Sequence, residues 1–195
     1  ALDSYSTLKA TSGPSHRIEP NGFALHLGSA PDSESDGEPS TDALGDDAAA
    51  SDLSPFTVAD FDDEDGVTFS SIATLLPGAT FTATLTATNQ IGASATACGW
   101  IDFNDDGDFD NAEASGGNNA ERICVSIPNA TADGTFDLDF TIPDDFVFDG
   151  GGDGVYFSRF RITTDWASAA ASSPTGSATD GEVEDFVIDT ETLPV

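Results

Sequence analysis

Apolar and polar residues alternate along several short segments between residues 66 and 188, and this pattern restricts the possible fold more than any other feature. Residues 80–88 read TFTATLTAT, so threonine occupies one face of the segment and apolar side chains occupy the other. A period of two is typical of a strand that is buried on one face only. The same alternation recurs, between turn residues, in segments 122–127, 136–142, 155–162 and 183–188.

No segment of ten or more residues carries an apolar stripe at helical spacing. We therefore predict an all-β fold, an antiparallel β-sandwich with Greek-key or jelly-roll-like connections. We expect one domain over residues 1–195. Its strand-rich core covers residues 66–195, and its N-terminal part, residues 1–65, is acidic and irregular apart from a short strand at residues 23–27.

The chain of 195 residues contains 36 acidic and 5 basic residues, which gives a formal net charge of −31 at pH 7. This imbalance argues against nucleic-acid binding, because phosphates require a basic surface. No apolar run is long enough to insert into a membrane. Two compatible explanations remain: a saline environment that screens the repulsion, or bound cations that neutralise the carboxylates. Acidic residues spaced as metal ligands favour the cations.

One acidic cluster has the full spacing of a calcium loop, D-x-[DN]-x-[DN]-G-x5-E. Calcium prefers about six to eight hard oxygen ligands, which alternate positions of such a loop direct to one side. The segment before the loop has the pattern of a strand, so we expect a β scaffold rather than an EF-hand. The alternative is a solvated, aspartate-rich turn. The predicted ligands are Asp102, Asn104, Asp106, Asp108, Asp110 and Glu113.

Three further acidic clusters are candidate calcium sites, so several calcium ions and long calcium-ordered loops are expected. Asp32, Glu34 and Asp36 begin like the same loop, but an acidic linker is an equal alternative. The other two clusters are far apart in the chain and are hypothesised to share one cation; the alternative is a solvated end of a surface strand. These two clusters are Asp62, Asp63 and Asp65, and Glu182, Glu184 and Asp185. In a strand, Glu182 and Glu184 project from one face and Asp185 projects from the other.

The two cysteines, Cys98 and Cys124, both lie in segments with strand patterns. A disulfide in an exported protein is the simplest interpretation, and a pair of buried free thiols is the alternative. No Cys-x-x-Cys pair is present, so a zinc site is not expected.

Several motifs together resemble the GEVED domain, a family of bacterial cell-surface and secreted proteins. Residues 181–186 read GEVEDF, the family's signature near its C-terminal end. Residues 99–104 (GWIDFN) with 106–109 (DGDF) are similar to its central strand and loop. Residues 63–67 (DEDGV) and 156–164 (YFSRFRITT) resemble two further family segments. With similarities in the N-terminal part, the resemblance extends over nearly the whole chain.

This resemblance implies a β-sandwich in a secreted or surface-exposed protein. It does not imply enzymatic activity, and we expect that the protein is not an enzyme. Such modules occur in large multidomain adhesins, including calcium-rich ones of the RTX type that are exported by type I secretion. We therefore expect a calcium-dependent module that binds a peptide or a carbohydrate on a host or biofilm surface and contacts neighbouring domains of the same adhesin. The alternative is a structural spacer that calcium makes rigid but that has no ligand of its own.

Two other interpretations of charged residues are possible. Paired carboxylates occur in glycosidases, but acidic residues are so abundant here that such a pair carries almost no information. Arg159 and Arg161 project from one face of a predicted strand. They are expected to neutralise nearby carboxylates, or alternatively to bind a carboxylate of the ligand.

Overall fold

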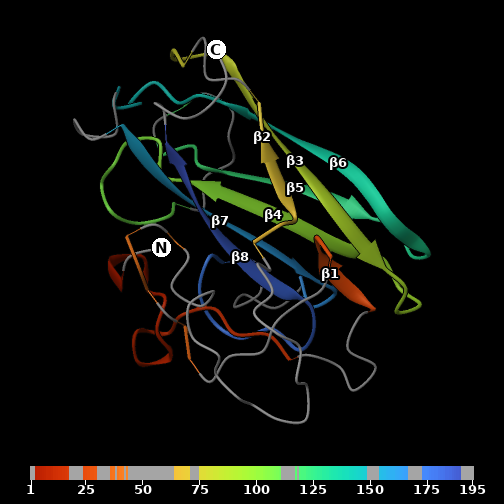
Figure 1. Ribbon diagram of the computed structural model, residues 1–195. Helices are drawn as coiled ribbons and strands as arrows, with labels where there is room; N and C mark the ends of the chain where they lie inside the picture. Colours follow the sequence, from red (N-terminus) through yellow and green to blue (C-terminus); the bar gives the residue numbers. More distant parts are fainter. Residues whose placement is uncertain are drawn as a thin grey trace.

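The computed structural model describes residues 3–17, 24–29, 36–37, 39–41, 43, 64–70, 75–110, 117, 119–148, 154–166 and 173–189. These residues form two antiparallel sheets and two short 3-10 helices, Asp3–Tyr5 and Lys9–Thr11 (Figure 1). None of the described helices is long and apolar enough to cross a lipid bilayer. The strands are β1 (Leu25–Leu27), β2 (Val67–Phe69), β3 (Thr80–Asn89), β4 (Ala95–Ile101), β5 (Arg122–Ile127), β6 (Thr131–Thr141), β7 (Val155–Thr163) and β8 (Glu182–Asp189).

The first sheet is built around β3. Strand β6 pairs with one edge of β3, while β1 and β2 pair with successive parts of the other edge. The alternation along β3 is realised as predicted, because its apolar side chains are buried in the core. On the opposite face, the hydroxyl groups of Thr82 and Thr84 donate hydrogen bonds of 2.7 Å to Asp139 and Asp137.

The second sheet has the strand order β5-β4-β7-β8. Its inner face packs on the first sheet through buried side chains such as Phe160 and Ile162. Its outer face is also covered: Trp100 and Phe157 belong to a second apolar cluster that includes Tyr5 of the N-terminal segment. The predicted β-sandwich is confirmed, and the central strands of its second sheet, β4 and β7, are buried on both faces.

Residues 3–17, called the N-terminal segment below, lie along residues 173–180 on this outer face. The carbonyl groups of Ser12 and Ser15 each accept a hydrogen bond of 2.8 Å, from Gly176 and Ala178. In Figure 1 the segment, drawn in red, lies on the side of β7 and β8 that faces away from the first sheet. Strand β1 is shorter than the predicted strand, and residue 23 lies outside the described residues.

Candidate metal centre

The predicted calcium loop begins directly after β4, where Asp102 is almost fully buried, at 1% exposure. Its Oδ1 accepts a hydrogen bond from the backbone N–H of Asp106 at 3.2 Å, and its Oδ2 accepts one from Gly107 at 3.1 Å. Gly107 has a φ of +90°, a conformation that glycine adopts without strain. The Asp102 side chain therefore folds the loop back over itself, as a calcium loop requires.

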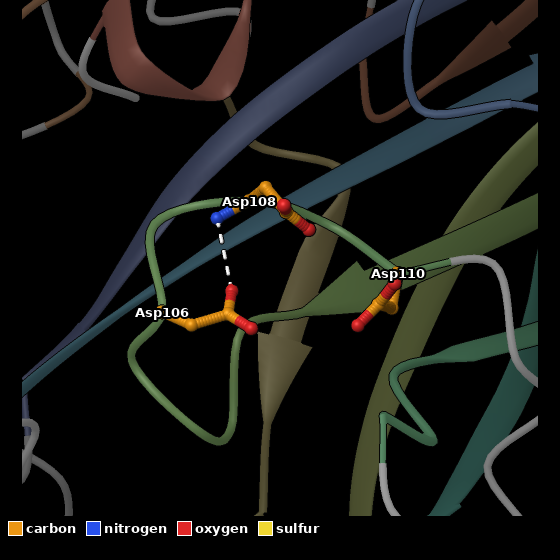
Figure 2. A group of neighbouring side chains, drawn as sticks. All are labelled: Asp106, Asp108 and Asp110. Carbon is orange, nitrogen blue, oxygen red and sulfur yellow. Dashed lines mark hydrogen bonds between the residues drawn. The ribbon is translucent and has the colours of Figure 1, made fainter.

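Three carboxylates meet in this loop. Asp106, Asp108 and Asp110 each offer an oxygen atom, and these atoms lie within 4.8 Å of one another (Figure 2). Asp106 and Asp108 are exposed, while Asp110 is partly buried. Partial burial, followed by the charges of the other two carboxylates, raises the pKa of Asp108 above its usual value. A divalent cation would relieve this repulsion, because oxygen atoms at this spacing are what calcium binds.

The structure adds a carboxylate that the spacing argument missed. Glu121 is fully buried, and its Oε2 accepts a hydrogen bond of 2.8 Å from the backbone N–H of Asp110. Its Oε1 is buried and has no hydrogen-bond partner among the described residues. Burial, and then the charges of Asp102, Asp110 and Asp106, raise the pKa of Glu121 to about 9.

An unsatisfied carboxylate in the protein interior is costly, and it is tolerated where a cation or a proton neutralises it. Glu121 is therefore a candidate cation ligand or a protonated carboxyl group. The grouped carboxylates of Asp106, Asp108 and Asp110, with the neighbouring Asp102 and Glu121 as further candidates, form a candidate donor set of hard oxygen atoms only, which suits calcium better than zinc or copper.

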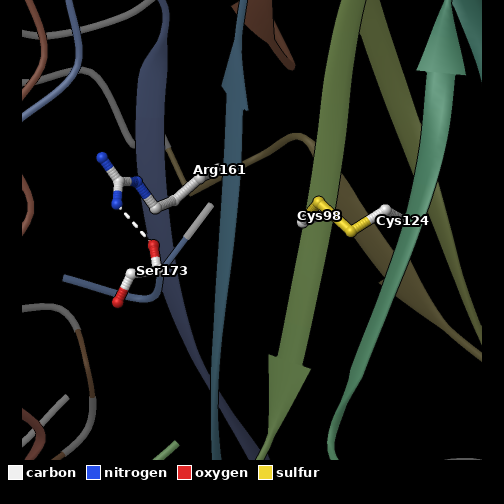
Figure 3. The surroundings of a disulfide bond; sticks show 4 residues. All are labelled: Cys98, Cys124, Arg161 and Ser173. Carbon is white, nitrogen blue, oxygen red and sulfur yellow. Dashed lines mark hydrogen bonds between the residues drawn. A yellow bond between two sulfur atoms is a disulfide. The ribbon is translucent and has the colours of Figure 1, made fainter. Parts of the chain in front are cut away.

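The predicted disulfide is present and joins the two segments that carry this donor set. Cys98 of β4 and Cys124 of β5 are direct cross-strand partners, separated by 26 residues in the sequence (Figure 3). Asp102 follows the first cysteine closely and Glu121 precedes the second. The backbone N–H of Ile101 also donates a hydrogen bond to the carbonyl of Glu121 at 3.1 Å. The disulfide and the β4–β5 pairing thus hold both buried carboxylates at the same end of the sheet.

A second group of acidic residues lies between β8 and the segment before β2. Glu182 and Glu184 are buried, at 5% and 1% exposure, and Glu184 accepts a hydrogen bond of 3.2 Å from the backbone N–H of Gly66. The neighbouring Asp65 accepts a hydrogen bond of 2.7 Å from the N–H of Ser29. The hydrogen bond from Gly66 places the residue next to Asp65 beside Glu184, whereas Asp62 and Asp63 lie outside the described residues. The shared cation stays a prediction.

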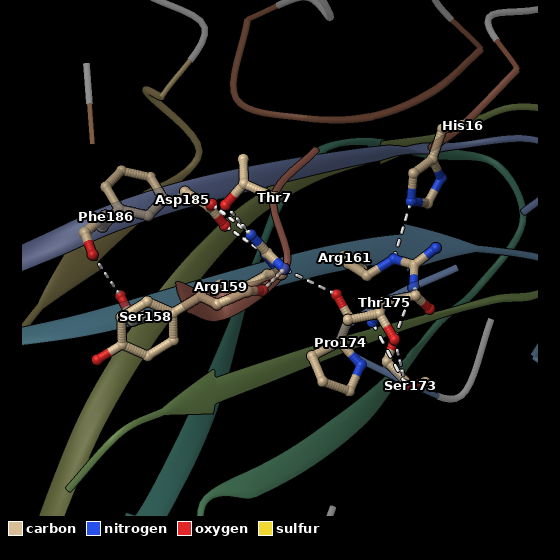
Figure 4. A network of polar contacts seen from close by, with 11 residues as sticks. Thr7, His16, Ser158, Arg159, Arg161, Ser173, Pro174, Thr175, Asp185 and Phe186 are labelled. Carbon is tan, nitrogen blue, oxygen red and sulfur yellow. Dashed lines mark hydrogen bonds and ion pairs between the residues drawn. The ribbon is translucent and has the colours of Figure 1, made fainter. Parts of the chain in front are cut away.

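Asp185 projects from the opposite face of β8 and pairs with a buried arginine. Arg159 Nε and Nη2 donate to the two Asp185 oxygens at 2.6 and 2.7 Å, and its other N–H groups donate to Tyr5, Thr7 and Pro174 (Figure 4). Burial alone would raise the pKa of Asp185, but the guanidinium of Arg159 holds it below its usual value. Both oxygens of this predicted ligand therefore bind a guanidinium.

Arg161 has a similar structural environment beside the N-terminal segment. Its Nε donates to His16 Nε2 at 3.0 Å, and its Nη groups donate to backbone carbonyls of residues 173, 175 and 176. His16 Nδ1 in turn contacts the carbonyl of Asp180 at 2.7 Å. Burial, followed by the charge of Arg161, lowers the pKa of His16 to about 3, so the imidazole is neutral and carries its proton on Nδ1.

The remaining predicted ligands are less informative. Asn104 donates to Asp106 Oδ2 at 3.0 Å. Asp36 accepts hydrogen bonds from the backbone N–H groups of Lys9 and Gly37. The other predicted ligands, Asp32, Glu34, Asp62, Asp63 and Glu113, lie outside the described residues.

The comparison with known families covers the part of the chain that contains the candidate metal centre. No curated protein and no solved structure matches the chain. The family model of the GEVED domain matches residues 96–189, which contain both cysteines, the loop from Asp102 to Asp110, Glu121 and the last strand. The sequence resemblance to the GEVED domain is thus supported for residues 96–189.

Proposed function

We propose that this protein is a calcium-dependent ligand-binding module of a large bacterial surface adhesin. The observation that carries the proposal is the buried, unsatisfied Oε1 of Glu121 beside the three grouped carboxylates of Asp106, Asp108 and Asp110. Calcium is the abundant extracellular cation that such an oxygen-only donor set prefers.

The two sides of the site differ in exposure, which favours ligand binding over a purely structural role. Asp102 and Glu121 are buried, whereas Asp106 and Asp108 are exposed. A cation held between them has protein ligands on its buried side and water on its exposed side. A carboxylate of a peptide, or two neighbouring hydroxyl groups of a carbohydrate, can replace such water molecules. We propose a ligand of this kind on a host or biofilm surface.

The cellular setting is part of the same proposal. The GEVED match at residues 96–189 and the Cys98–Cys124 disulfide support a secreted or surface-exposed location, because disulfides persist in oxidising compartments. We propose additional calcium at the buried glutamates of β8 beside Asp65, neighbouring adhesin domains as partners, and no catalytic activity.

Calorimetric titration of the purified chain with calcium tests the metal site. The double variant Asp106→Asn/Asp108→Asn should bind one calcium ion fewer than the wild type. The matched control, Asp137→Asn/Asp139→Asn, removes the same charge from the exposed face of β6 and should bind as the wild type does. Chelation by EDTA should lower the melting temperature by about 10 °C for each tightly bound ion. Absence of calcium binding at low salt would overturn the proposal.

Arrays of glycans and peptides, probed with the wild type in calcium and in EDTA, test the adhesive role. Binding that disappears in EDTA and in Asp106→Asn/Asp108→Asn supports it. Calcium-dependent stability without retention on any array would favour the structural spacer.

A further inference from the structure

We infer that Tyr5 positions the cation ligand Asp102 and thereby couples cation binding to the docking of the N-terminal segment on the second sheet. The inference rests on the proposed function, because it concerns the regulation of the same site.

Tyr5 connects the N-terminal segment to the metal loop directly. Its side chain is 4% exposed, and its hydroxyl group donates a hydrogen bond of 2.6 Å to Asp102 Oδ2. With the N–H groups of Asp106 and Gly107, Asp102 accepts three hydrogen bonds, two of them on Oδ2. A carboxylate has about four lone-pair positions, so the remaining one, on Oδ1, is oriented by the three bonds. Hydrogen bonds of this kind fix the orientation of a carboxylate that binds a metal.

A second contact connects the same two parts of the molecule through aromatic rings. Phe109 lies in the metal loop between two predicted ligands, Asp108 and Asp110, and its side chain is buried. The ring of Tyr5 lies 4.6 Å from the ring of Phe109 and 5.1 Å from that of Phe157. The guanidinium of Arg159 lies 5.4 Å from the centre of the Phe109 ring. Any displacement of the loop that moves Phe109 therefore changes the contacts of Tyr5 and Arg159.

The rest of the segment is held by contacts that depend on one another. Arg159 donates to the carbonyl of Tyr5 at 3.1 Å and to Thr7 Oγ1 at 3.2 Å, while Arg161 donates to His16 (Figure 4). Backbone hydrogen bonds then join residues 12 and 15 to residues 176 and 178. All of these partners are distant in sequence, so the segment docks as a unit or loses many contacts together.

The coupling follows from these shared contacts. In the absence of a cation, repulsion among the loop carboxylates favours conformations in which Asp102 and Phe109 move away from their positions under Tyr5. A bound cation holds the loop together and so favours the docked segment. Thermodynamic linkage requires the reverse effect as well: a docked segment raises the affinity of the site for the cation by the same factor.

Calcium affinity of the full chain, measured by calorimetry, tests the role of Tyr5. Tyr5→Phe keeps the ring contacts and removes only the hydroxyl group, and it should weaken calcium binding about tenfold, the usual cost of losing a partner of a metal ligand. The matched control is Tyr156→Phe. Tyr156 is 3% exposed, and its hydroxyl group donates a hydrogen bond of 2.8 Å to the carbonyl of Val147 and not to a predicted metal ligand. This control should bind calcium as the wild type does.

A substitution remote from the loop tests the coupling itself. A methyl group at Gly13 would lie 2.1 Å from the carbonyl oxygen of Thr7, so Gly13→Ala should loosen the docked segment. We expect it to weaken calcium binding at least threefold. Hydrogen exchange of the wild type should show calcium-dependent protection of the amides at positions 11–13, 15 and 176–178.

The outcomes separate this inference from the proposed function. If the wild type binds calcium, but both Tyr5→Phe and Gly13→Ala retain its affinity and exchange is independent of calcium, the coupling is refuted and the metal site stands. If the wild type binds no calcium, the proposed function and the coupling both fail.

Discussion

Glu121→Gln should change the stability of the protein in opposite directions with and without calcium. The variant keeps the size of the side chain and an oxygen that can accept the hydrogen bond of Asp110, but it removes the charge. In EDTA the wild type must keep Glu121 protonated or bury its charge beside other carboxylates. In calcium the same charge becomes a source of cation affinity.

The size of the effect in EDTA follows from the pKa of this carboxyl group. Burial first, and neighbouring carboxylates second, raise the pKa of Glu121 to about 9, from 4.5 in the unfolded chain. A raised pKa gives stability that is complete below pH 4.5 and is lost as the pH rises towards 9. At pH 7 the loss amounts to about 3 kcal/mol. Glu121→Gln should therefore be more stable than the wild type by about 3 kcal/mol at pH 7, and by little at pH 4.

Urea denaturation in EDTA at both pH values, together with calorimetric titration with calcium at pH 7, measures the two effects. The variant should bind calcium at least about a hundredfold more weakly, because a buried ligand charge is lost. Asp137→Asn controls for the change in net charge, since it removes one exposed carboxylate. A variant that is less stable than the wild type in EDTA, or that binds calcium equally well, would refute the assignment of Glu121 to the metal centre.

Three further predictions concern the scaffold around the site. Cys98→Ala/Cys124→Ala removes a cross-link that spans 26 residues and should cost about 3.5 kcal/mol of unfolding free energy, as measured by urea denaturation under non-reducing conditions. The lowered pKa of His16, about 3, gives stability that is complete above pH 6.5 and is lost as the pH falls towards 3, by about 2 kcal/mol between pH 7 and pH 5. His16→Gln should reduce this pH dependence, and an unchanged slope would contradict the neutral imidazole. Arg159→Lys cannot reproduce the paired bonds to Asp185 and should cost about 3 kcal/mol, whereas a loss below 1 kcal/mol in thermal melts would show that the ion pair contributes little.

The strands were predictable because alternation is a local signal. The threonines of residues 80–88 and the aspartates at 137 and 139 occupy one face of the sheet because successive side chains in any strand point to opposite faces. The turn of the predicted calcium loop also follows from its spacing, because Asp102 is followed at fixed intervals by Asp106 and Gly107, whose backbone N–H groups it binds.

No spacing rule predicted that Glu121 lies beside the loop that follows β4. It reaches the loop through strand pairing, because Trp100 lies opposite Arg122 and the disulfide fixes that register. The predicted disulfide could have indicated this position, because pairing the two cysteines places the residues just before β5 beside those at the end of β4.

The hydrogen-bond partners of the two buried arginines could not be predicted without the tertiary structure. The sequence showed that Arg159 and Arg161 share a face, and neutralisation of carboxylates was one of two interpretations. Arg159 does pair with Asp185, but most of the remaining partners of both arginines are backbone carbonyls, which no residue type identifies.

The arrangement of the first sheet has a practical consequence for work on related sequences. The family match begins within β4, so β1, β2 and β3 precede it, and only β6 of that sheet lies inside it. An expression boundary placed at residue 96 would leave the inner side chains of β4 and β7 without the layer on which they pack. Fragments that begin upstream of Tyr5 keep both layers and the covering of the outer face, and are the appropriate starting point for biochemical study.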